Sequence, residues 1–364
     1  MQRGAPVRSS ADFSRNNLDC LRLILASIVV LYHLSLTNVP ALAFDRYFSA
    51  RFAVDAFFVI SGLLIYRSYV RSSSVRSYSE KRVRRIYPAY VTVVVLAALA
   101  LCPLSSLPVS QYFGAGFWKY LGANLAFLNF LAPSLPGVFT SNSISGVNGA
   151  LWTLKIEVAF YLFVPILHWI CSRLGTKKVM GAIFLFSYAW KYGFAYLASL
   201  HRSPSAFSLD GSRSIYDMLE VQFPAQLMYF CAGILLLLYF DRLKFHFLAI
   251  AIITASLFLL DHFFTRGLID VLWISGLVFV FGFWLYFGNF AKYGDFSYGV
   301  YIVHFPIIQT MISFGLATKL HPAVFVLMVL CLVGLASVLM WHLVEKRFLA
   351  GSSHYRQGSV KVPA

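Results

Sequence analysis

The feature that most constrains this sequence is a series of apolar runs, each about as long as a membrane-spanning helix. A helix crosses the hydrocarbon core of a bilayer with about 20 consecutive apolar residues. Hydrophobic residues make up 59% of the 364-residue chain and charged residues only 12%, whereas a typical soluble domain carries about 25% charged residues. A chain with this balance cannot cover its surface with polar groups. The sequence therefore predicts an all-α polytopic membrane protein.

We predict ten transmembrane helices with both termini in the cytoplasm. The expected spans lie near residues 18–40, 52–70, 86–107, 150–171, 179–200, 218–240, 247–265, 269–288, 296–318 and 323–343. In this arrangement most of the 30 Lys and Arg residues fall on the cytoplasmic side, as the positive-inside rule requires. The net charge of +16 then reflects topology, and we expect no nucleic-acid partner.

An additional apolar segment, residues 117–132, is short and interrupted. If it also crossed the membrane, every later loop would change sides, against the positive-inside bias. We therefore expect it to be re-entrant or to lie at the outer surface. It belongs to the long stretch 103–149, which is either a lid over an acceptor site or a linker. Residues 1–17 and 344–364 are expected to be a cytoplasmic N-terminal segment and a short basic cytoplasmic tail.

The cysteines and the first apolar run bear on processing and metal binding. No small-residue cleavage site follows the first run, so we expect a spanning helix and not a cleaved signal peptide. The cysteines lie in or beside apolar runs and form no CxxC pair. We expect them to be buried small hydrophobes, not disulfides or metal ligands. They are Cys20, Cys102, Cys171, Cys231 and Cys331.

The first predicted helix carries two ionisable side chains that a simple span does not need, Arg22 and His33. An ionisable group inside a span costs about 2.5–3.5 kcal/mol on insertion scales and is by default a functional candidate. The two residues share one helix face and lie roughly 16 Å apart along the axis. Arg22 either extends to the interface beside Asp19 or binds a ligand. His33 is either an interhelical hydrogen-bonding residue or a reactive group.

The second span and the loop after it add two polar features. Asp55 lies near one end of the span, and Ser61 and Gly62 lie in its middle, where small residues either pack against a helix or contact a ligand. The loop "EKRVRRIYPAY" is either a topology signal or a polyanion site suited to phosphates. Its clustered basic residues are Lys81, Arg82, Arg84 and Arg85.

Two later spans begin with polar side chains on one face. In "NGALWTLKIEVAFYLFVP", Thr153, Glu157 and Tyr161 recur at one-turn intervals after an interfacial Trp152. The other stretch, "DFSYGVYIVHFPII", also places polar residues on one face, and its histidine is either structural or functional. Those residues are Ser297, Tyr301 and His304.

Together these stretches resemble the type-3 acyltransferase family of bacterial membrane O-acyltransferases. The matching pieces occur in order as "NNLDCLRLILASIVVLYH", "DAFFVISGLLI", "KRVRRIYP", "NGALWTLKIE" and "SYGVYIVHFP", and the resemblance covers about residues 16–347. The resemblance implies a ten-helix bundle, with residues 18–343 forming a single transmembrane acyltransferase domain. The residues that match the family's functional motifs are Arg22, His33, Arg82, Arg85, Trp152, Glu157, Ser297, Tyr298, Tyr301 and His304.

The resemblance also implies an activity and a location. The donor is cytoplasmic acyl-CoA, usually acetyl-CoA, acting as a co-substrate with no permanently bound cofactor or metal. The acceptor is a sugar hydroxyl of a cell-surface or exported polysaccharide, such as an exopolysaccharide, or of its lipid-linked oligosaccharide precursor. The chain would lie in the bacterial cytoplasmic (inner) membrane as a multi-pass protein. The lipid bilayer and other polysaccharide-assembly proteins would be its further partners.

A mechanism follows from the shape of acyl-CoA, which has a phosphate-rich head and a long arm that ends in a thioester. We expect Arg82, Arg85 and Arg22 to bind the head. An arm of about the Arg22–His33 separation brings the thioester to His33, which acts either as a general base or as an acyl carrier. Glu157, the second catalytic candidate, either orients His33 or binds the acceptor.

Further candidates for acceptor binding or for stabilising an oxyanion come from several spans. They are Asp55, Ser61, Trp152, Ser297, Tyr298, Tyr301 and His304. The closing "VEKRF" lacks the proline often found after the glutamate, so Glu345 receives no site role. No secreted hydrolase-like domain follows the last span, as expected of a stand-alone member that decorates exopolysaccharides or nodulation factors.

Alternative functions remain open at this point. A transporter or flippase of a glycolipid or acylated intermediate would also place charges within the membrane, but would move its substrate without consuming acyl-CoA. A non-enzymatic membrane scaffold leaves the polar face of the first helix unexplained. The acyl group itself is either acetyl or another group, such as succinyl.

Overall fold

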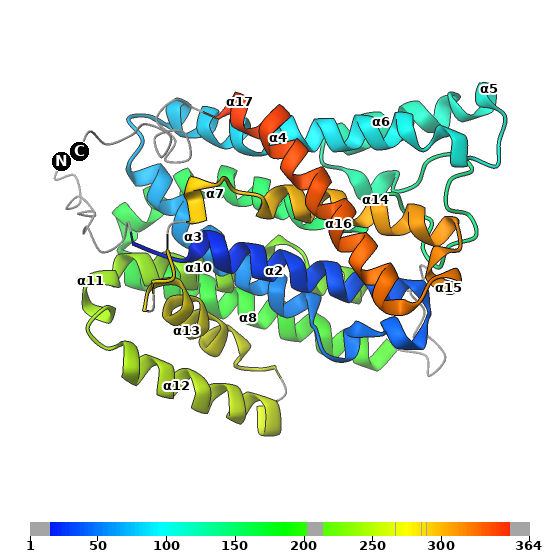
Figure 1. Cartoon of the computed structure of the whole chain (residues 1–364). Helices are drawn as coiled ribbons and strands as arrows, with labels where there is room; N and C mark the ends of the chain where they lie inside the picture. The colour runs from blue at the N-terminus through cyan, green and yellow to red at the C-terminus, as the bar shows by residue number, and fades with distance from the viewer. Residues whose placement is uncertain (1–14, 202–213, 266, 285, 289, 350–364) are drawn as a thin grey trace, which may run out of the picture. The chain divides into compact units, whose positions relative to one another are not determined.

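The computed structural model describes residues 15–201, 214–265, 267–284, 286–288 and 290–349, and this part is helical without a strand (Figure 1). Within it, seven helices are long and apolar enough to cross a membrane. They are Leu18–Thr37, Ala50–Val70, Val75–Ala100, Gly149–Leu174, Ile215–Leu238, Phe247–Thr265 and Pro322–Phe348. The helical fold is thus confirmed, and the chain is a multi-pass membrane protein. The total of ten spans and the orientation of the termini stay predictions.

Helices also form at the other three expected spans. These are α8 (Thr176–His201), α13 (Asp270–Phe283) and α14 (Ser297–Ser313). The additional segment at 117–132 overlaps α6 (Ala115–Leu125), a helix of 11 residues. Such a helix is only about 16 Å long, about half the thickness of the hydrocarbon core. Therefore α6 cannot cross the membrane.

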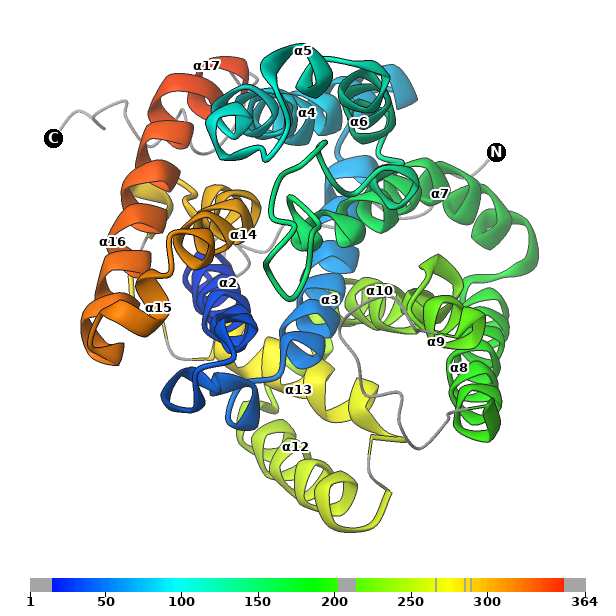
Figure 2. The ribbon, with the colours of Figure 1, turned by 90° about the vertical axis from the view of Figure 1, so that its right-hand side faces the viewer.

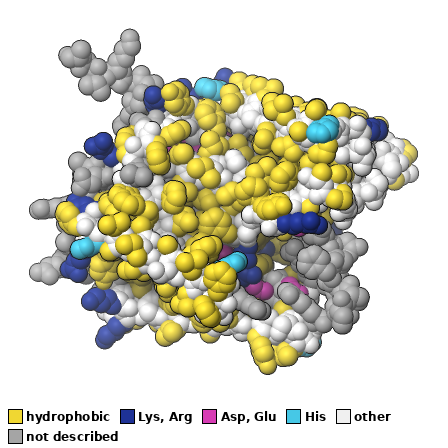
Figure 3. Space-filling view, turned by 60° about the horizontal axis from the view of Figure 1, so that its bottom comes forward, with side chains coloured by type: hydrophobic (Ala, Val, Ile, Leu, Met, Phe, Trp, Pro, Cys, Tyr) yellow, Lys and Arg dark blue, Asp and Glu magenta, His cyan; other side chains and the backbone are white. Residues whose placement is uncertain are grey.

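The surface of the molecule fits a hydrocarbon environment. Hydrophobic side chains cover much of the face drawn in Figure 3. Helix α12 (Phe247–Leu260) is apolar except for Thr254 and Ser256 and has no buried residue. An apolar surface of this extent is rare on soluble monomers and is normal against lipid.

The chain divides into two compact units. Unit 1 comprises Met1–Arg22, Arg51–Ser79 and Ile156–Asn289. Unit 2 comprises Leu23–Ala50, Glu80–Lys155 and Phe290–Ala364. In unit 1, α10 (Phe223–Leu238) packs against α8 and α13, and α12 packs along α13. In unit 2, α14 packs against α16 (Pro322–Met340).

A direct backbone crossing joins two helices of unit 1, α3 (Ala50–Val70) and α10. A Cβ atom placed on Gly62 of α3 would lie 1.9 Å from the carbonyl oxygen of Phe230 on α10. A Cβ atom on Gly233 of α10 would likewise lie 1.9 Å from the carbonyl oxygen of Val59. Only glycine fits at both positions, so the packing interpretation of Gly62 accounts for it.

The cysteines are all free thiols. Cys171 and Cys231 are buried in unit 1, as the sequence predicts. Cys20 and Cys102 are half-buried. Cys331 is exposed, so the expectation of burial is wrong there, because Cys331 lies on the same exposed face of α16 as Leu327 and Leu335.

Candidate functional site

Helix α14 organises the candidate site of unit 2, because polar side chains along its whole length reach other segments of the chain. Figure 2 shows α14 beside α16 and near the end of α2 (Leu18–His33). Four residues that the sequence singles out lie on this helix. They are Ser297, Tyr298, Tyr301 and His304, and all four are buried.

The contact of greatest chemical interest on α14 joins two histidines. His33, the last residue of α2, places its Nδ1 atom 3.0 Å from Nε2 of His304. Nδ1 of His304 lies 3.1 Å from the carbonyl oxygen of Val300, one turn earlier on α14. Tyr32 and Phe305 pack edge-on against the His33 ring. His304 is completely buried, and His33 is half-buried as a residue.

The hydroxyl groups of Tyr298 and Tyr301 on α14 both have hydrogen-bond partners within unit 2. The Tyr301 hydroxyl lies 2.8 Å from Oγ1 of Thr153 on α7 (Trp152–Leu174). The Tyr298 hydroxyl donates to the carbonyl oxygen of Ile86, on α4 (Val75–Ala100), at 3.0 Å. These contacts fix the rotation of α14 and therefore the direction of His304.

A proline explains why two distant stretches of the sequence belong together. Pro306 in α14 has no N–H, so the carbonyl of Ile302 lacks its usual helical donor. The side-chain amide of Asn148 donates to this carbonyl at 2.8 Å. Oδ1 of Asn148 accepts from the backbone N–H of Ala150 at 3.2 Å, at the turn that leads into α7. The Asn148 side chain thus supplies a donor to the Ile302 carbonyl of α14 and an acceptor to the Ala150 N–H before α7.

At the N-terminal end of α14, Arg85 of α4 is held by two carboxylates. Its guanidinium forms ion pairs with Asp295 and with Glu345, the latter at 3.3 Å. Both carboxylates are almost fully buried, at 1% side-chain exposure, and Arg85 is 13% exposed. Ser297 donates to Asp295 at 2.5 Å. Glu345, to which the sequence analysis gave no role, is therefore part of this site, and the missing proline after it does not disturb the contact.

The remaining predicted site residues of α4 and α7 have simpler surroundings. Arg82 and Trp152 are half-buried in unit 2. Glu157 belongs to unit 1, is half-buried, and accepts a hydrogen bond of 2.6 Å from the Tyr161 hydroxyl. Ser61 of α3 is also half-buried. The roles proposed for these residues stay predictions.

Arg22 lies in unit 1, where it pairs with Asp19 at 3.8 Å. This confirms the expected contact one turn apart on α2. Both side chains are partly exposed, at 17% and 19%.

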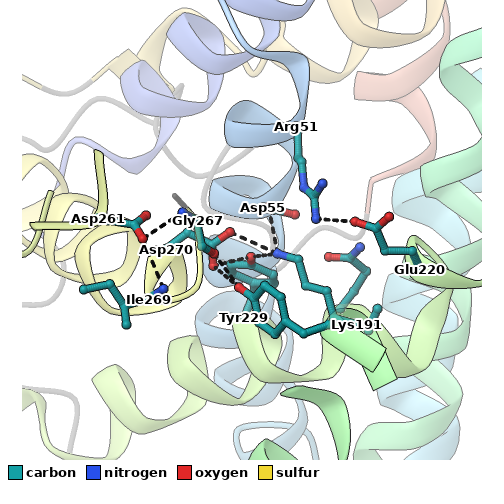
Figure 4. A network of polar contacts seen from close by, with 12 residues as sticks. Arg51, Asp55, Lys191, Glu220, Tyr229, Asp261, Gly267, Ile269 and Asp270 are labelled. Carbon is teal, nitrogen blue, oxygen red and sulfur yellow. Dashed lines mark hydrogen bonds and ion pairs between the residues drawn. The ribbon is translucent and has the colours of Figure 1, made fainter. Parts of the chain in front are cut away.

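Unit 1 contains a buried polar network, of which the sequence pattern predicted only Asp55 (Figure 4). Lys191 of α8 is 1% exposed and lies 3.0 Å from Asp270 and 3.7 Å from Asp55. The Tyr229 hydroxyl also contacts Lys191 and donates to Asp270 at 2.7 Å. Asp55, a predicted acceptor or oxyanion candidate, is therefore surrounded by protein groups. Lys191 was missed, although a lysine inside an apolar helix is itself a signal.

Other polar contacts border this network in Figure 4. Arg51 pairs with Glu220 at 2.7 Å. Asp261 accepts hydrogen bonds from the backbone N–H groups of Gly267 and Ile269. Among the residues that the structure describes, no group of three or more His, Cys, Asp or Glu side chains is arranged to hold a metal ion.

This chain is similar to other proteins over most of its length. It is 28% identical to nodulation protein 10 of Rhizobium leguminosarum bv. viciae over 337 residues, which is 85% of this chain and 87% of that protein. It is 28% identical to an O-acetyl transferase of Shigella phage Sf6 over 353 residues, or 93% of this chain and 97% of that protein.

A shorter similarity links the chain to the peptidoglycan O-acetyltransferase OatA of Listeria monocytogenes. The two are 25% identical over 193 residues, which is 48% of this chain and 28% of that protein. No solved structure matches the chain. The profile of the family described as an acyltransferase domain matches residues 15–342, nearly the whole chain. The chain therefore belongs to the type-3 acyltransferase family.

Proposed function

We propose that this acyltransferase is a membrane O-acetyltransferase of the bacterial cytoplasmic membrane. It moves an acetyl group from cytoplasmic acetyl-CoA to a sugar hydroxyl of a cell-surface or exported polysaccharide or of its lipid-linked precursor. The observation that carries the proposal is the His33–His304 pair, which brings two imidazoles within 3.0 Å of each other at the end of α2. The O-acetyl transferase of phage Sf6 and OatA of Listeria support the acetyl group and the ester product.

The proposed reaction needs no bound cofactor. The oxygen of the sugar hydroxyl bonds to the thioester carbon while His33 takes the hydroxyl proton. The carbon–sulfur bond then breaks, and the proton passes from His33 to the sulfur of coenzyme A. In the two-step alternative a nitrogen of His33 bonds to the acetyl carbon as the carbon–sulfur bond breaks and coenzyme A leaves as the thiolate. The sugar oxygen then bonds to that carbon as the carbon–nitrogen bond breaks, and the hydroxyl proton passes to the thiolate. Both routes use an imidazole nitrogen that carries a lone pair.

We propose that basic residues of α4 bind the phosphate-bearing head of acyl-CoA. Arg82 and Arg85, with the neighbouring Lys81 and Arg84, concentrate positive charge that suits the phosphates of acyl-CoA. A phosphate that reaches Arg85 has to compete with Asp295 and Glu345 for the guanidinium. We therefore propose that Arg85 chiefly holds Asp295 and Glu345 in place at this end of α14. Arg82 would make the main contact with the phosphates.

The experiment uses the purified full chain in liposomes with labelled acetyl-CoA and a candidate glycan. We expect labelled ester on the glycan and release of an equal amount of free coenzyme A thiol. The matched control is His33→Gln, which should form neither product. Movement of glycan or acetyl label across the membrane without release of the thiol would contradict the proposal and favour a transporter or flippase.

A further inference from the structure

The hydrogen bonds of the His33–His304 pair run in one direction. The carbonyl oxygen of Val300 can only accept, so Nδ1 of His304, at 3.1 Å, carries a proton. A neutral imidazole has a single N–H, which leaves Nε2 of His304 as an acceptor. Nδ1 of His33 lies 3.0 Å from that acceptor and must donate to it. The lone pair of His33 is then on Nε2, the ring nitrogen that does not bond to His304.

The surroundings of His304 favour its neutral form. The side chain is completely buried. Its described neighbours are the backbone carbonyls of Val300 and Tyr301, the rings of Tyr301 and Phe305, and His33. None of these described neighbours is a carboxylate, and a buried charge without an opposite charge is costly. With one N–H on each ring, only the order Val300–His304–His33 satisfies both hydrogen bonds.

We propose that His304 is a positioning residue that fixes the tautomer of His33, so that Nε2 of His33 faces the substrate as the reactive nitrogen. The consequence for catalysis depends on the proposed acetyl transfer, whereas the tautomer is inferred from hydrogen bonds. Besides the two described above, His33 hydrogen-bonds to the backbone carbonyl of Val29, one turn earlier on α2. This is the same one-turn relation that joins Nδ1 of His304 to Val300, so it too is consistent with a proton on Nδ1 of His33. Nε2 takes the proton of the sugar hydroxyl as the oxygen bonds to the thioester carbon. It returns that proton to the coenzyme A sulfur as the carbon–sulfur bond breaks.

The opposite tautomer would not work in this geometry. A proton on Nε2 of His33 would leave the lone pair on Nδ1, which points to His304. His33 would then carry no lone pair on the nitrogen that does not face His304, and Nε2 of His304 would face a second lone pair across 3.0 Å. His304 thus acts through His33, as the third group of a catalytic triad acts through its histidine.

The direct test is the protonation of the two ring nitrogens of His33. The full chain is labelled with ring-15N histidine and reconstituted in liposomes, and its nitrogen NMR spectrum is recorded near neutral pH. The His33 signals are assigned by their loss in His33→Gln. We expect an N–H at Nδ1 and an unprotonated Nε2 in the wild-type protein. A wild-type spectrum with the proton on Nε2 overturns the proposal without any measurement of activity.

Two variants of His304 link the tautomer to turnover. His304→Gln keeps an acceptor for His33 and a donor for Val300, so we expect the Nε2 lone pair to persist and kcat to stay within about tenfold of wild type. His304→Leu removes the acceptor, and we expect mixed tautomers and a loss in kcat of about 10²-fold or more with little change in KM. Wild-type kcat in His304→Leu would contradict the positioning role.

The control is His168→Leu, which removes a histidine whose Nδ1 lies 3.0 Å from the Tyr66 hydroxyl in unit 1. It should leave both the His33 spectrum and kcat unchanged. If the wild-type protein forms no ester yet shows the Nε2 lone pair, the tautomer assignment is supported and the proposed function fails. The two proposals are therefore separable.

Discussion

His33 is the residue whose replacement discriminates most sharply between a chemical and a structural role. His33→Gln and His33→Asn keep a side chain that can hydrogen-bond to His304, but an amide accepts no proton near neutral pH. We expect both variants to fold and to lose transfer by about 10²–10⁴-fold, or more if His33 carries the acetyl group.

Arg22→Lys keeps the charge without the planar fork and should only impair transfer. Transfer of labelled acetyl in liposomes measures all three, and an active His33→Gln would remove His33 from the chemistry.

Arg85 sits between two buried carboxylates, so its removal should affect stability before donor binding. Arg85→Ala leaves Asp295 and Glu345 without this cation, and removing one partner of a buried ion pair costs about 3–5 kcal/mol. We expect a lower unfolding temperature in detergent. Adding Asp295→Asn and Glu345→Gln to Arg85→Ala should recover much of the loss, because the uncompensated charges are gone. If Arg85→Ala unfolds at the wild-type temperature, these ion pairs contribute nothing to the fold.

Arg82 offers a cleaner probe of the donor site. We expect Arg82→Ala to weaken binding of acetyl-CoA by the purified protein more than it changes acceptor preference, because a phosphate contact is lost. Arg76→Ala is the matched control, since it removes a basic residue of the same helix outside the Arg-x-x-Arg motif. If Arg82→Ala binds acetyl-CoA as the wild type does, the basic residues at 81–85 act only as a topology signal.

At the scale of elements, the contact between Asn148 and α14 makes a testable pair with Pro306. Asn148→Ala leaves the Ile302 carbonyl without its donor, and an unsatisfied buried acceptor costs about 1–3 kcal/mol. Pro306→Ala restores a backbone N–H to that carbonyl. We therefore expect the double variant to lose less stability than the sum of the two single changes. Thermal unfolding of the four proteins measures this coupling, and strict additivity would argue against it.

The elements themselves were predictable because long apolar runs determine where helices form. A helix forms in each of the ten expected ranges, and α14 runs on through Pro306. Contacts between helices were not predictable, because hydropathy does not set how each helix is rotated or where it crosses another. Lys191 meets Asp270 across 79 residues of sequence, and Arg85 meets Glu345 across 260.

The candidate site shows the same limit. The sequence singled out His33 and His304 separately, as polar groups within apolar spans. It gave no sign that the two rings would meet across 271 residues. Nor did it show which nitrogen of each ring takes part in the hydrogen bond, and this detail decides the tautomer.

At the scale of the whole molecule, the main prediction is the topology. We expect residues 67–85 and the C-terminal tail to face the cytoplasm and residues 103–149 to face outward, because this places most basic residues inside. A cysteine-free background is needed, since the chain has five native cysteines. An impermeant thiol reagent added outside cells should label Ser141→Cys and leave Lys177→Cys unlabelled. External labelling of Lys177→Cys would overturn the ten-helix arrangement.

The glycine crossing of α3 and α10 limits how unit 1 can move. With Gly62 and Gly233 against opposing carbonyl oxygens, a slide of one residue, about 1.5 Å along the axis, drives a side chain into the neighbouring backbone. The two helices are therefore locked in register, and any slow motion during a turnover carries them as one rigid body. We expect their amide hydrogens around the crossing to exchange with solvent among the slowest in the protein, and turnover to leave that rate unchanged.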